Sequence, residues 1–151
     1  MKVATSAAAQ QQNIKINKRP QLALDVAFKT GSSGIQVYVE RPGHGAKAQD
    51  DSHIKVHYEG WLSKDFTLFD SSRAKLRPFE FDLGKGSVID GWEIALKGVR
   101  QGTKMQIKIP AKLAYGSQGA ASMGIPPNAD LIFKVEVLKV TWRVSIPLVA
   151  K

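Results

Sequence analysis

The chain has 151 residues, 43% hydrophobic and 23% charged, which are proportions of an ordinary globular domain. It contains no cysteine, which excludes a disulfide framework, a thiol nucleophile and a cysteine-ligated zinc or iron–sulfur site. No apolar stretch approaches the roughly 18 residues of a membrane-spanning helix, so we expect a soluble domain with no membrane partner.

The net charge of +9 is unevenly distributed, because the first acidic residue is Asp25. Four basic residues precede it: Lys2, Lys15, Lys18 and Arg19. Together with the Ala/Gln run at 7–12, they predict a disordered basic tail over residues 1–19. The tail lacks the continuous apolar core of a secretory signal, and four charges attract nucleic acid only weakly. We expect a cytoplasmic protein, with organelle or nuclear targeting by this segment as the alternative.

Apolar and polar residues alternate along most of the remaining chain, a pattern typical of strands with one buried face. Residues 20–34 form an N-terminal extension, in which 22–28 predict a strand and 31–34 a turn. The alternation continues in the segments 35–39, 54–58, 79–83, 105–109 and 131–140. A last alternation at 142–146 predicts another strand in a C-terminal extension, 141–151.

One stretch has helical spacing. Its apolar residues fall on one stripe: Val88, Ile89, Trp92, Leu96 and Val99. Ser87 is the predicted N-cap, Asp90 lies in the first turn, and Gly98 closes the C-terminus. Several antiparallel strands with a single helix to cover their apolar face predict an α+β domain.

The common catalytic and metal-binding patterns are not present. His53 and His57 lie on a predicted strand, about 13 Å apart, too far for one metal ion. The Gly-rich segment 84–87 lacks the spacing of a phosphate-binding loop, and Ser71 and Ser72 have no nucleophile-elbow motif. We expect no metal site and no nucleophilic hydrolysis.

Aromatic residues instead lie on several elements: Tyr58, Phe69, Phe79, Trp92, Tyr115 and Phe133. Any one of them could belong to the core. However, Tyr58, Trp92 and Tyr115 carry polar groups that seek partners at partly open sites. Asp70 directly follows Phe69, and a carboxylate beside a large apolar residue must be paired or exposed. An aromatic pocket with one polar group suits a mostly apolar ligand that has an amide carbonyl.

Several short motifs occur in an order that resembles that of a known protein family. The segments are 56–60 (VHYEG), 69–73 (FDSSR), 78–81 (PFEF), 83–92 (LGKGSVIDGW), 114–116 (AYG), 125–129 (IPPNA) and 131–133 (LIF). Over residues 35–140 the chain resembles the FKBP-type, macrolide-binding peptidyl-prolyl cis/trans isomerases. The resemblance implies a five- to six-stranded antiparallel sheet wrapped around one short helix, to which the termini could add edge strands. It also implies rotation of X-Pro bonds in protein substrates without a cofactor, and binding of macrolides such as rapamycin and tacrolimus.

Carried over by position, the resemblance implies one pocket for substrate and macrolide. Its residues are Tyr58, Phe69, Asp70, Phe79, Ser87, Val88, Ile89, Trp92, Tyr115, Ile125 and Phe133. The catalytic members are Phe69, Asp70, Trp92, Tyr115 and Phe133. Trp92 would form the floor, and the Ile89 N–H and Tyr115 hydroxyl would donate to the ligand carbonyl. The Ser87 carbonyl would be an acceptor, and Asp70 a polar positioner.

The loop 117–124 departs from the family pattern. It has Ala120 or Ala121 where many relatives have His, and it is one residue longer than the commonest form. We therefore expect any contact with a partner protein at this loop to differ from that of relatives.

Two alternatives to an enzyme are a binding module that uses the same pocket and a nucleic-acid contact by the basic tail. We expect a monomer, although the segments 22–28 and 142–146 could also form a dimer interface.

Overall fold

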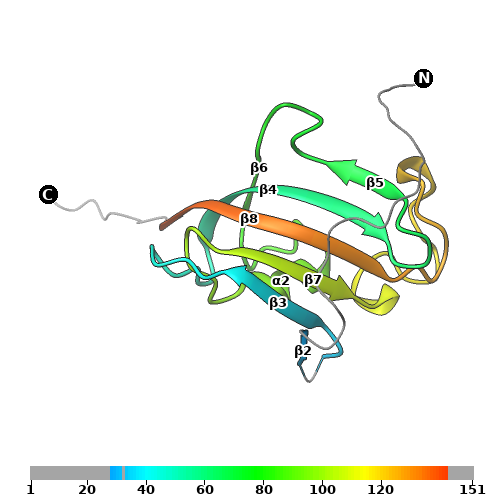
Figure 1. Cartoon of the computed structure of the whole chain (residues 1–151), viewed down its shortest axis with the longest axis horizontal. Helices are drawn as coiled ribbons and strands as arrows, with labels where there is room; N and C mark the ends of the chain where they lie inside the picture. Colours follow the sequence, from blue (N-terminus) through cyan, green and yellow to red (C-terminus); the bar gives the residue numbers. More distant parts are fainter. Residues whose placement is uncertain (1–27, 32, 143–151) are drawn as a thin grey trace, which may run out of the picture.

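The computed structural model describes residues 28–31 and 33–142 (Figure 1). Seven antiparallel strands form one open sheet in the order β2-β3-β7-β8-β4-β5, and β6 pairs with β4 outside this path. The strands are β2 (Lys29–Thr30), β3 (Gln36–Arg41), β4 (Ser52–Leu62), β5 (Leu68–Ser71), β6 (Phe79–Asp82), β7 (Lys104–Ile109) and β8 (Leu131–Trp142). Two 3₁₀ turns, η2 (Ala111–Leu113) and η3 (Ala121–Met123), precede β8.

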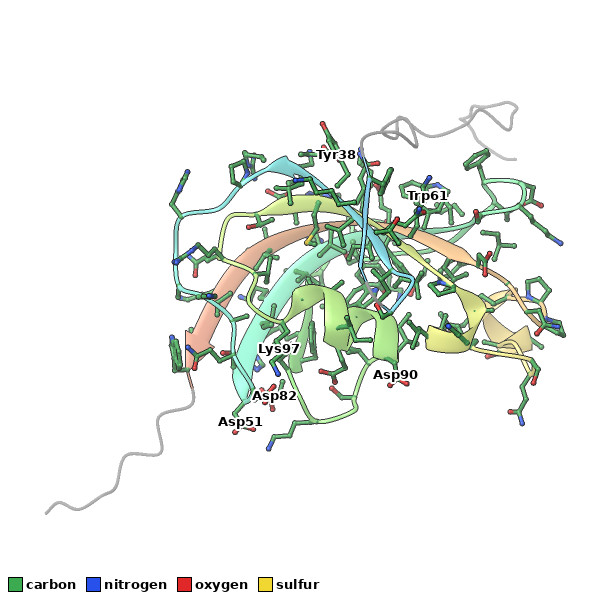
Figure 2. All side chains as sticks on the ribbon, turned by 90° about the horizontal axis from the view of Figure 1, so that it is seen from below. Tyr38, Asp51, Trp61, Asp82, Asp90 and Lys97 are labelled. Carbon is green, nitrogen blue, oxygen red and sulfur yellow. The ribbon has the colours of Figure 1, made fainter. Side chains whose placement is uncertain are left out.

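The sheet curves around α2 (Asp90–Leu96), the one α-helix in the described chain, as Figure 2 shows from below. This arrangement confirms the predicted α+β class and the sheet wrapped around a short helix. The sheet has one more strand than the six expected, because the short β2 pairs with β3 at one edge. No helix among residues 28–31 and 33–142 is long and apolar enough to cross a membrane.

The central strands follow the predicted alternation. β4 pairs with β8 along its whole length, from Ser52 opposite Trp142 to Leu62 opposite Leu131. The inward-facing residues of β4, β7 and β8 are buried and pack against Trp92 and Leu96 of α2. A Cβ on Gly91 would lie 2.5 Å from Ile109 Cγ2, so this glycine lets the helix approach β7 closely. Each fully buried large apolar side chain stabilises the fold by about 1.5–3 kcal/mol.

Three expectations differ from the structure. The helix begins at Asp90, with Ile89 extended at the N-cap position (ψ 152°) and no side-chain cap, so the Ser87 cap is wrong. The Ser87 hydroxyl instead donates to the Asp82 carbonyl at 3.5 Å. Val39 is exposed, because the ladder between β3 and β7 shifts register there. β5 was not predicted as a strand. The predicted strand 22–28 lies outside the described residues except for its last residue, and 142–146 except for its first.

Candidate active site

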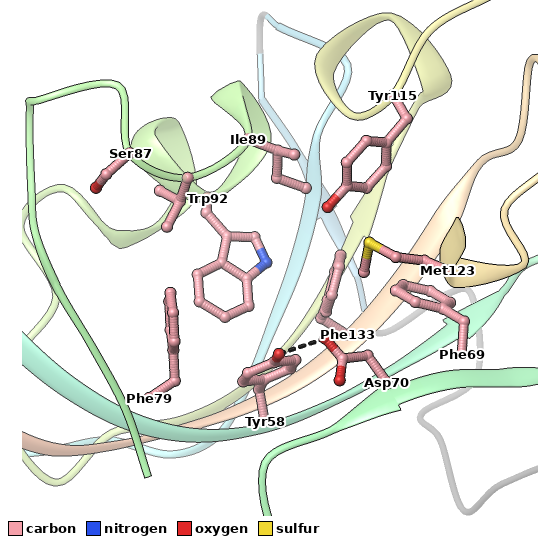
Figure 3. Close-up of a pocket in the computed structure, with 11 residues that line it drawn as sticks. Tyr58, Phe69, Asp70, Phe79, Ser87, Ile89, Trp92, Tyr115, Met123 and Phe133 are labelled. Carbon is pink, nitrogen blue, oxygen red and sulfur yellow. Dashed lines mark hydrogen bonds between the residues drawn. The ribbon is translucent and has the colours of Figure 1, made fainter. Parts of the chain in front are cut away.

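A cavity of about 340 Å³ opens between the concave face of the sheet and the start of α2 (Figure 3). It is lined by Tyr58, Phe69, Asp70, Phe79, Ser87, Val88, Ile89, Trp92, Tyr115, Met123 and Phe133. Four strands supply five of these side chains, whereas the remainder come from α2, the segment before it, and the connection between β7 and β8. The curvature of the sheet thus brings together residues that are 75 positions apart in the sequence.

Trp92 forms the floor of the cavity. It is 4% exposed, and its ring is nearly perpendicular to those of Tyr58, Phe133 and Phe79, with centroids 5.1, 5.4 and 6.0 Å away. Each such edge-to-face contact adds about 0.5–1.5 kcal/mol beyond simple burial. The buried indole nitrogen has no hydrogen-bond partner in the described part of the chain. The packing of these rings makes the floor a rigid aromatic surface.

Gly60 makes room for this aromatic cluster. A Cβ at this position of β4 would lie 2.6 Å from Phe69 Cζ and 2.8 Å from Phe133 Cε1. The rings of Phe69 and Phe133 therefore meet over bare backbone, 5.7 Å apart and nearly perpendicular. Glycine within a strand commonly marks such a close approach, and this signal could have identified Gly60 as a site residue.

Asp70 is the one carboxylate that lines the cavity, and three donors hold it. The Tyr58 hydroxyl and the Ser71 N–H (2.9 Å) donate to it, and Lys75 Nζ lies 2.8 Å from its Oδ1. Burial acts to raise the pKa of Asp70, but the hydrogen bonds from Lys75 and Tyr58 outweigh it and lower that pKa. The carboxylate is thus ionised at neutral pH and held by three donors, which suits a fixed negative charge rather than a proton acceptor.

Two hydrogen-bond donors lie across the cavity from Asp70. The Tyr115 hydroxyl points into the cavity in Figure 3. Burial, followed by the charge of Asp70, raises the pKa of Tyr115, so the hydroxyl stays protonated. The backbone N–H of Ile89 donates to no acceptor among the described residues. A ligand whose apolar ring lies on Trp92 could thus accept two hydrogen bonds at its carbonyl oxygen.

The matching family model spans residues 44–138 and describes the FKBP-type peptidyl-prolyl cis-trans isomerases. The chain belongs to this family. It is 45% identical over 107 residues to an FK506-binding protein of Neisseria meningitidis serogroup B, covering 71% of this chain and 96% of the relative. It is also 45% identical over 94 residues to the peptidyl-prolyl cis-trans isomerase FPR2 of Saccharomyces cerevisiae, covering 62% of this chain and 69% of that relative.

Among solved structures, FkpA from Escherichia coli has a TM-score of 0.71 and 38% sequence identity, with 78% of this chain and 53% of FkpA covered. The protein is therefore an FKBP-type peptidyl-prolyl cis-trans isomerase. The curved sheet around one helix is the arrangement that the resemblance implied.

The FKBP cavity contains ten of the eleven residues expected to form it. Ile125 is the exception, because it is 2% exposed and packs in the core. Ile125 and Ala120 form a bridge around η3, and Gly124 turns the chain in a left-handed conformation (φ +77°). This turn directs Ile125 inward and leaves Met123 at the cavity, a residue that sequence reasoning missed.

The histidines of the FKBP domain lie away from the cavity lining. His53 bonds Glu80 and Asp82, and His57 bonds the Ser72 hydroxyl at 2.8 Å. Ser72 is buried, and its hydroxyl also accepts the Tyr58 N–H, so this serine has a structural role. In residues 28–31 and 33–142 no group of three or more potential ligands could hold a metal ion.

Proposed function

We propose that this isomerase assists protein folding by rotating X-Pro bonds in polypeptides, and that macrolides such as rapamycin and tacrolimus bind in the same cavity. The observation that carries the proposal is the composition of the cavity. It has an apolar floor at Trp92, an engaged carboxylate at Asp70, and donors at Tyr115 and Ile89. These groups fit a proline-like ring attached to an amide carbonyl.

The energetic argument starts from the amide itself. Rotation of an X-Pro bond crosses a barrier of about 18–20 kcal/mol, because it breaks amide resonance. The planar amide is charge-separated and well solvated, whereas the twisted transition state has lost resonance. A dry aromatic cavity therefore disfavours the planar amide more than the twisted one. A barrier lowered by about 4 kcal/mol gives roughly a thousandfold acceleration.

Each cavity residue would have a separate role in the isomerisation. The proline ring would lie on Trp92, and the carbonyl would turn between the Ile89 N–H and the Tyr115 hydroxyl. Asp70 would orient the polar side of the substrate without accepting a proton, because isomerisation forms and breaks no covalent bond to hydrogen. The pKa directions at Asp70 and Tyr115 keep both groups in these states at neutral pH.

Macrolide binding rests on the same features. A rigid ligand that presents a ring and a nearby carbonyl would fill the apolar cavity without losing much conformational freedom. The name of the Neisseria relative, an FK506-binding protein, supports this ligand class. Such a ligand would compete directly with polypeptide substrates.

The test is an isomerisation assay on a Leu-Pro peptide, with and without rapamycin, together with refolding of a protein limited by proline isomerisation. We expect acceleration of both reactions, suppressed by stoichiometric rapamycin. Asp70→Val should lower kcat/KM about tenfold, which corresponds to a loss of about 1.4 kcal/mol. The matched control is Glu59→Gln, which removes a carboxylate from the other face of β4.

Rapamycin binding without acceleration would contradict the folding role and leave a binding module. Acceleration that rapamycin does not suppress would contradict the shared cavity. Equal activity of Asp70→Val and Glu59→Gln would contradict the role assigned to Asp70.

A further inference from the structure

Three connecting segments surround the mouth of the cavity. They are 72–79, from the end of β5 to the first residue of β6, 83–89 before α2, and 110–125 after β7. Each reaches the cavity directly, through Phe79, Ile89 and Tyr115 respectively. We call these three segments the rim.

The rim contains five basic residues and no acidic residue. The basic residues are Arg73, Lys75, Arg77, Lys85 and Lys112. Three of them pair with carboxylates from outside the rim, Arg73 with Glu136, Lys75 with Asp70 and Lys85 with Asp51.

Arg77 and Lys112 are exposed, and neither forms an ion pair within the described residues. Acidic residues flank the rim in the sequence at Asp70, Glu80, Asp82 and Asp90. Asp70 pairs with Lys75, and Glu80 and Asp82 bond His53. Asp130 accepts the Ala111 N–H. Arg77 and Lys112 thus place two positive charges without an ion-pair partner in segments that line an apolar cavity, where they attract anionic groups.

Leu76 is an unusual residue at this rim. Its side chain is 90% exposed, and its backbone is left-handed, with φ +59°. Leucine in this conformation costs about 1–2 kcal/mol, and an exposed side chain returns nothing through burial. Strain of this kind, kept at the mouth of a site, points to a functional contact. The loop between β5 and β6 stands away from the sheet in Figure 1. Within this loop, Leu76 lies between Lys75 and Arg77 in the sequence.

We infer that the rim selects acidic polypeptides: substrates with Asp or Glu two to four residues from the X-Pro bond, and with an apolar side chain that contacts Leu76. An extended chain advances about 3.3 Å per residue, so these positions lie about 7–13 Å from the proline. Because Phe79, Ile89 and Tyr115 of the rim line the cavity itself, a substrate seated on Trp92 would pass the rim at these positions. This inference rests on the proposed function, because it names the polypeptides that the cavity would process.

The experiment compares three peptides of equal length with a central Leu-Pro pair, flanked by Glu, Gln or Lys. In 20 mM NaCl we expect kcat/KM to be at least about tenfold higher for the Glu peptide than for the Lys peptide. In 500 mM NaCl the ratio should fall to about twofold, since salt screens exposed charges. The double variant Arg77→Gln/Lys112→Gln should lower the low-salt ratio at least threefold.

The matched control, Lys29→Gln/Lys139→Gln, removes two positive charges from exposed positions on β2 and β8 and should leave the ratio unchanged. Equal kcat/KM for the Glu and Lys peptides, or a ratio that salt and the rim variant do not change, would overturn the inference. Failure to turn over even the Gln peptide would overturn the proposed function, a result distinct from loss of charge selectivity.

Leu76→Asn tests the apolar contact separately. Asparagine tolerates the left-handed conformation, so we expect the variant to unfold at an equal or higher urea concentration than the wild type. KM for a Glu peptide with a flanking Leu should rise about threefold, with kcat unchanged. An unchanged KM would overturn the role of Leu76 while leaving the charge selectivity to stand on the rim variants.

Discussion

The two faces of β4 are built from alternate residues of the same strand, yet different interactions stabilise them. The concave face presents Tyr58 and Gly60 to the aromatic cavity, with Trp92 packed against them. The outer face presents His57 and Glu59 to a shallow polar surface. Burial makes each contact on the concave face energetically important, whereas solvent screens the contacts on the outer face.

The outer face also carries ion pairs. Glu136 accepts from Arg73 at 2.6 Å and from Arg41 at 3.1 Å, and both arginine side chains are more than half exposed. His53 lies between Glu80 and Asp82 at 2.8 and 2.9 Å. Stability and ligand binding therefore depend mainly on the same, concave face of this sheet.

The largest expected effect is that of Trp92→Ala. Removing a buried tryptophan should lower the free energy of unfolding by about 3–5 kcal/mol and abolish measurable isomerase activity. Trp142→Ala is the matched control, because Trp142 is 47% exposed at the end of β8 and should cost less than about 1 kcal/mol. Urea unfolding of both variants makes the comparison. Equal losses would show that the concave face does not dominate stability.

Gly60→Ala should have the next largest effect. The added methyl group must displace Phe69 or Phe133, which costs about 1–3 kcal/mol in a packed core and distorts the cavity. Gly31→Ala is the control, since the nearest atom to its Cβ would be 3.8 Å away. We expect reduced kcat/KM and a lower thermal midpoint for the first variant alone. Wild-type behaviour of Gly60→Ala would contradict the close approach of the two rings.

A smaller effect concerns pH. The hydrogen bonds with Glu80 and Asp82 raise the pKa of His53 above its ordinary value. Two carboxylates can both accept only if the imidazole is protonated. The stabilisation is therefore fully present below the unfolded pKa of about 6.5 and is lost as pH rises through the folded pKa. Because the side chain is 37% exposed, we expect a loss of less than about 1 kcal/mol.

Urea unfolding between pH 6 and pH 9 measures this loss. His53→Gln should flatten the pH dependence over that range, whereas His44→Gln, which removes an exposed imidazole, should leave the slope as in the wild type. A slope that survives in His53→Gln would show that another group is responsible.

The smallest effect should follow from Glu136→Gln. This change breaks the contacts with Arg41 and Arg73, yet exposed ion pairs typically contribute only about 0.2–1 kcal/mol. The loss should shrink further in 0.5 M NaCl, because the charges are screened. Isomerase activity on a neutral peptide provides the second readout and should not change. A loss as large as that of Gly60→Ala would reverse the comparison between the two faces.

The central strands could be predicted from the sequence, because one buried and one solvated face impose a period of two on β4, β7 and β8. β5 could not be predicted. It is a four-residue edge strand in which Leu68 is exposed and Asp70 is held by its neighbours, so its residues do not follow a simple alternation. The start of the helix was also missed, because Val88 and Ile89 continue the apolar stripe but line the cavity.

Most of the candidate site could be predicted from family motifs, whereas the aromatic residues alone left core and pocket as alternatives. The sequence could not predict that Met123 lines the cavity while Ile125 is buried in the core, since this depends on the turn around Gly124. The role of Lys75 was missed for a similar reason, because its partner Asp70 lies across a loop whose path the local pattern does not fix.

The placement of β6 has a consequence for the size of ligand that the cavity can accept. β8 supports β4 along its full length, whereas β6 pairs only with β4, from His53 to Val56. Phe133 therefore lies on a strand with neighbours on both sides, whereas Phe79 lies on a strand with one neighbour. We expect a ligand larger than a proline ring to be accommodated on the Phe79 side of the cavity, because fewer backbone hydrogen bonds hold that side.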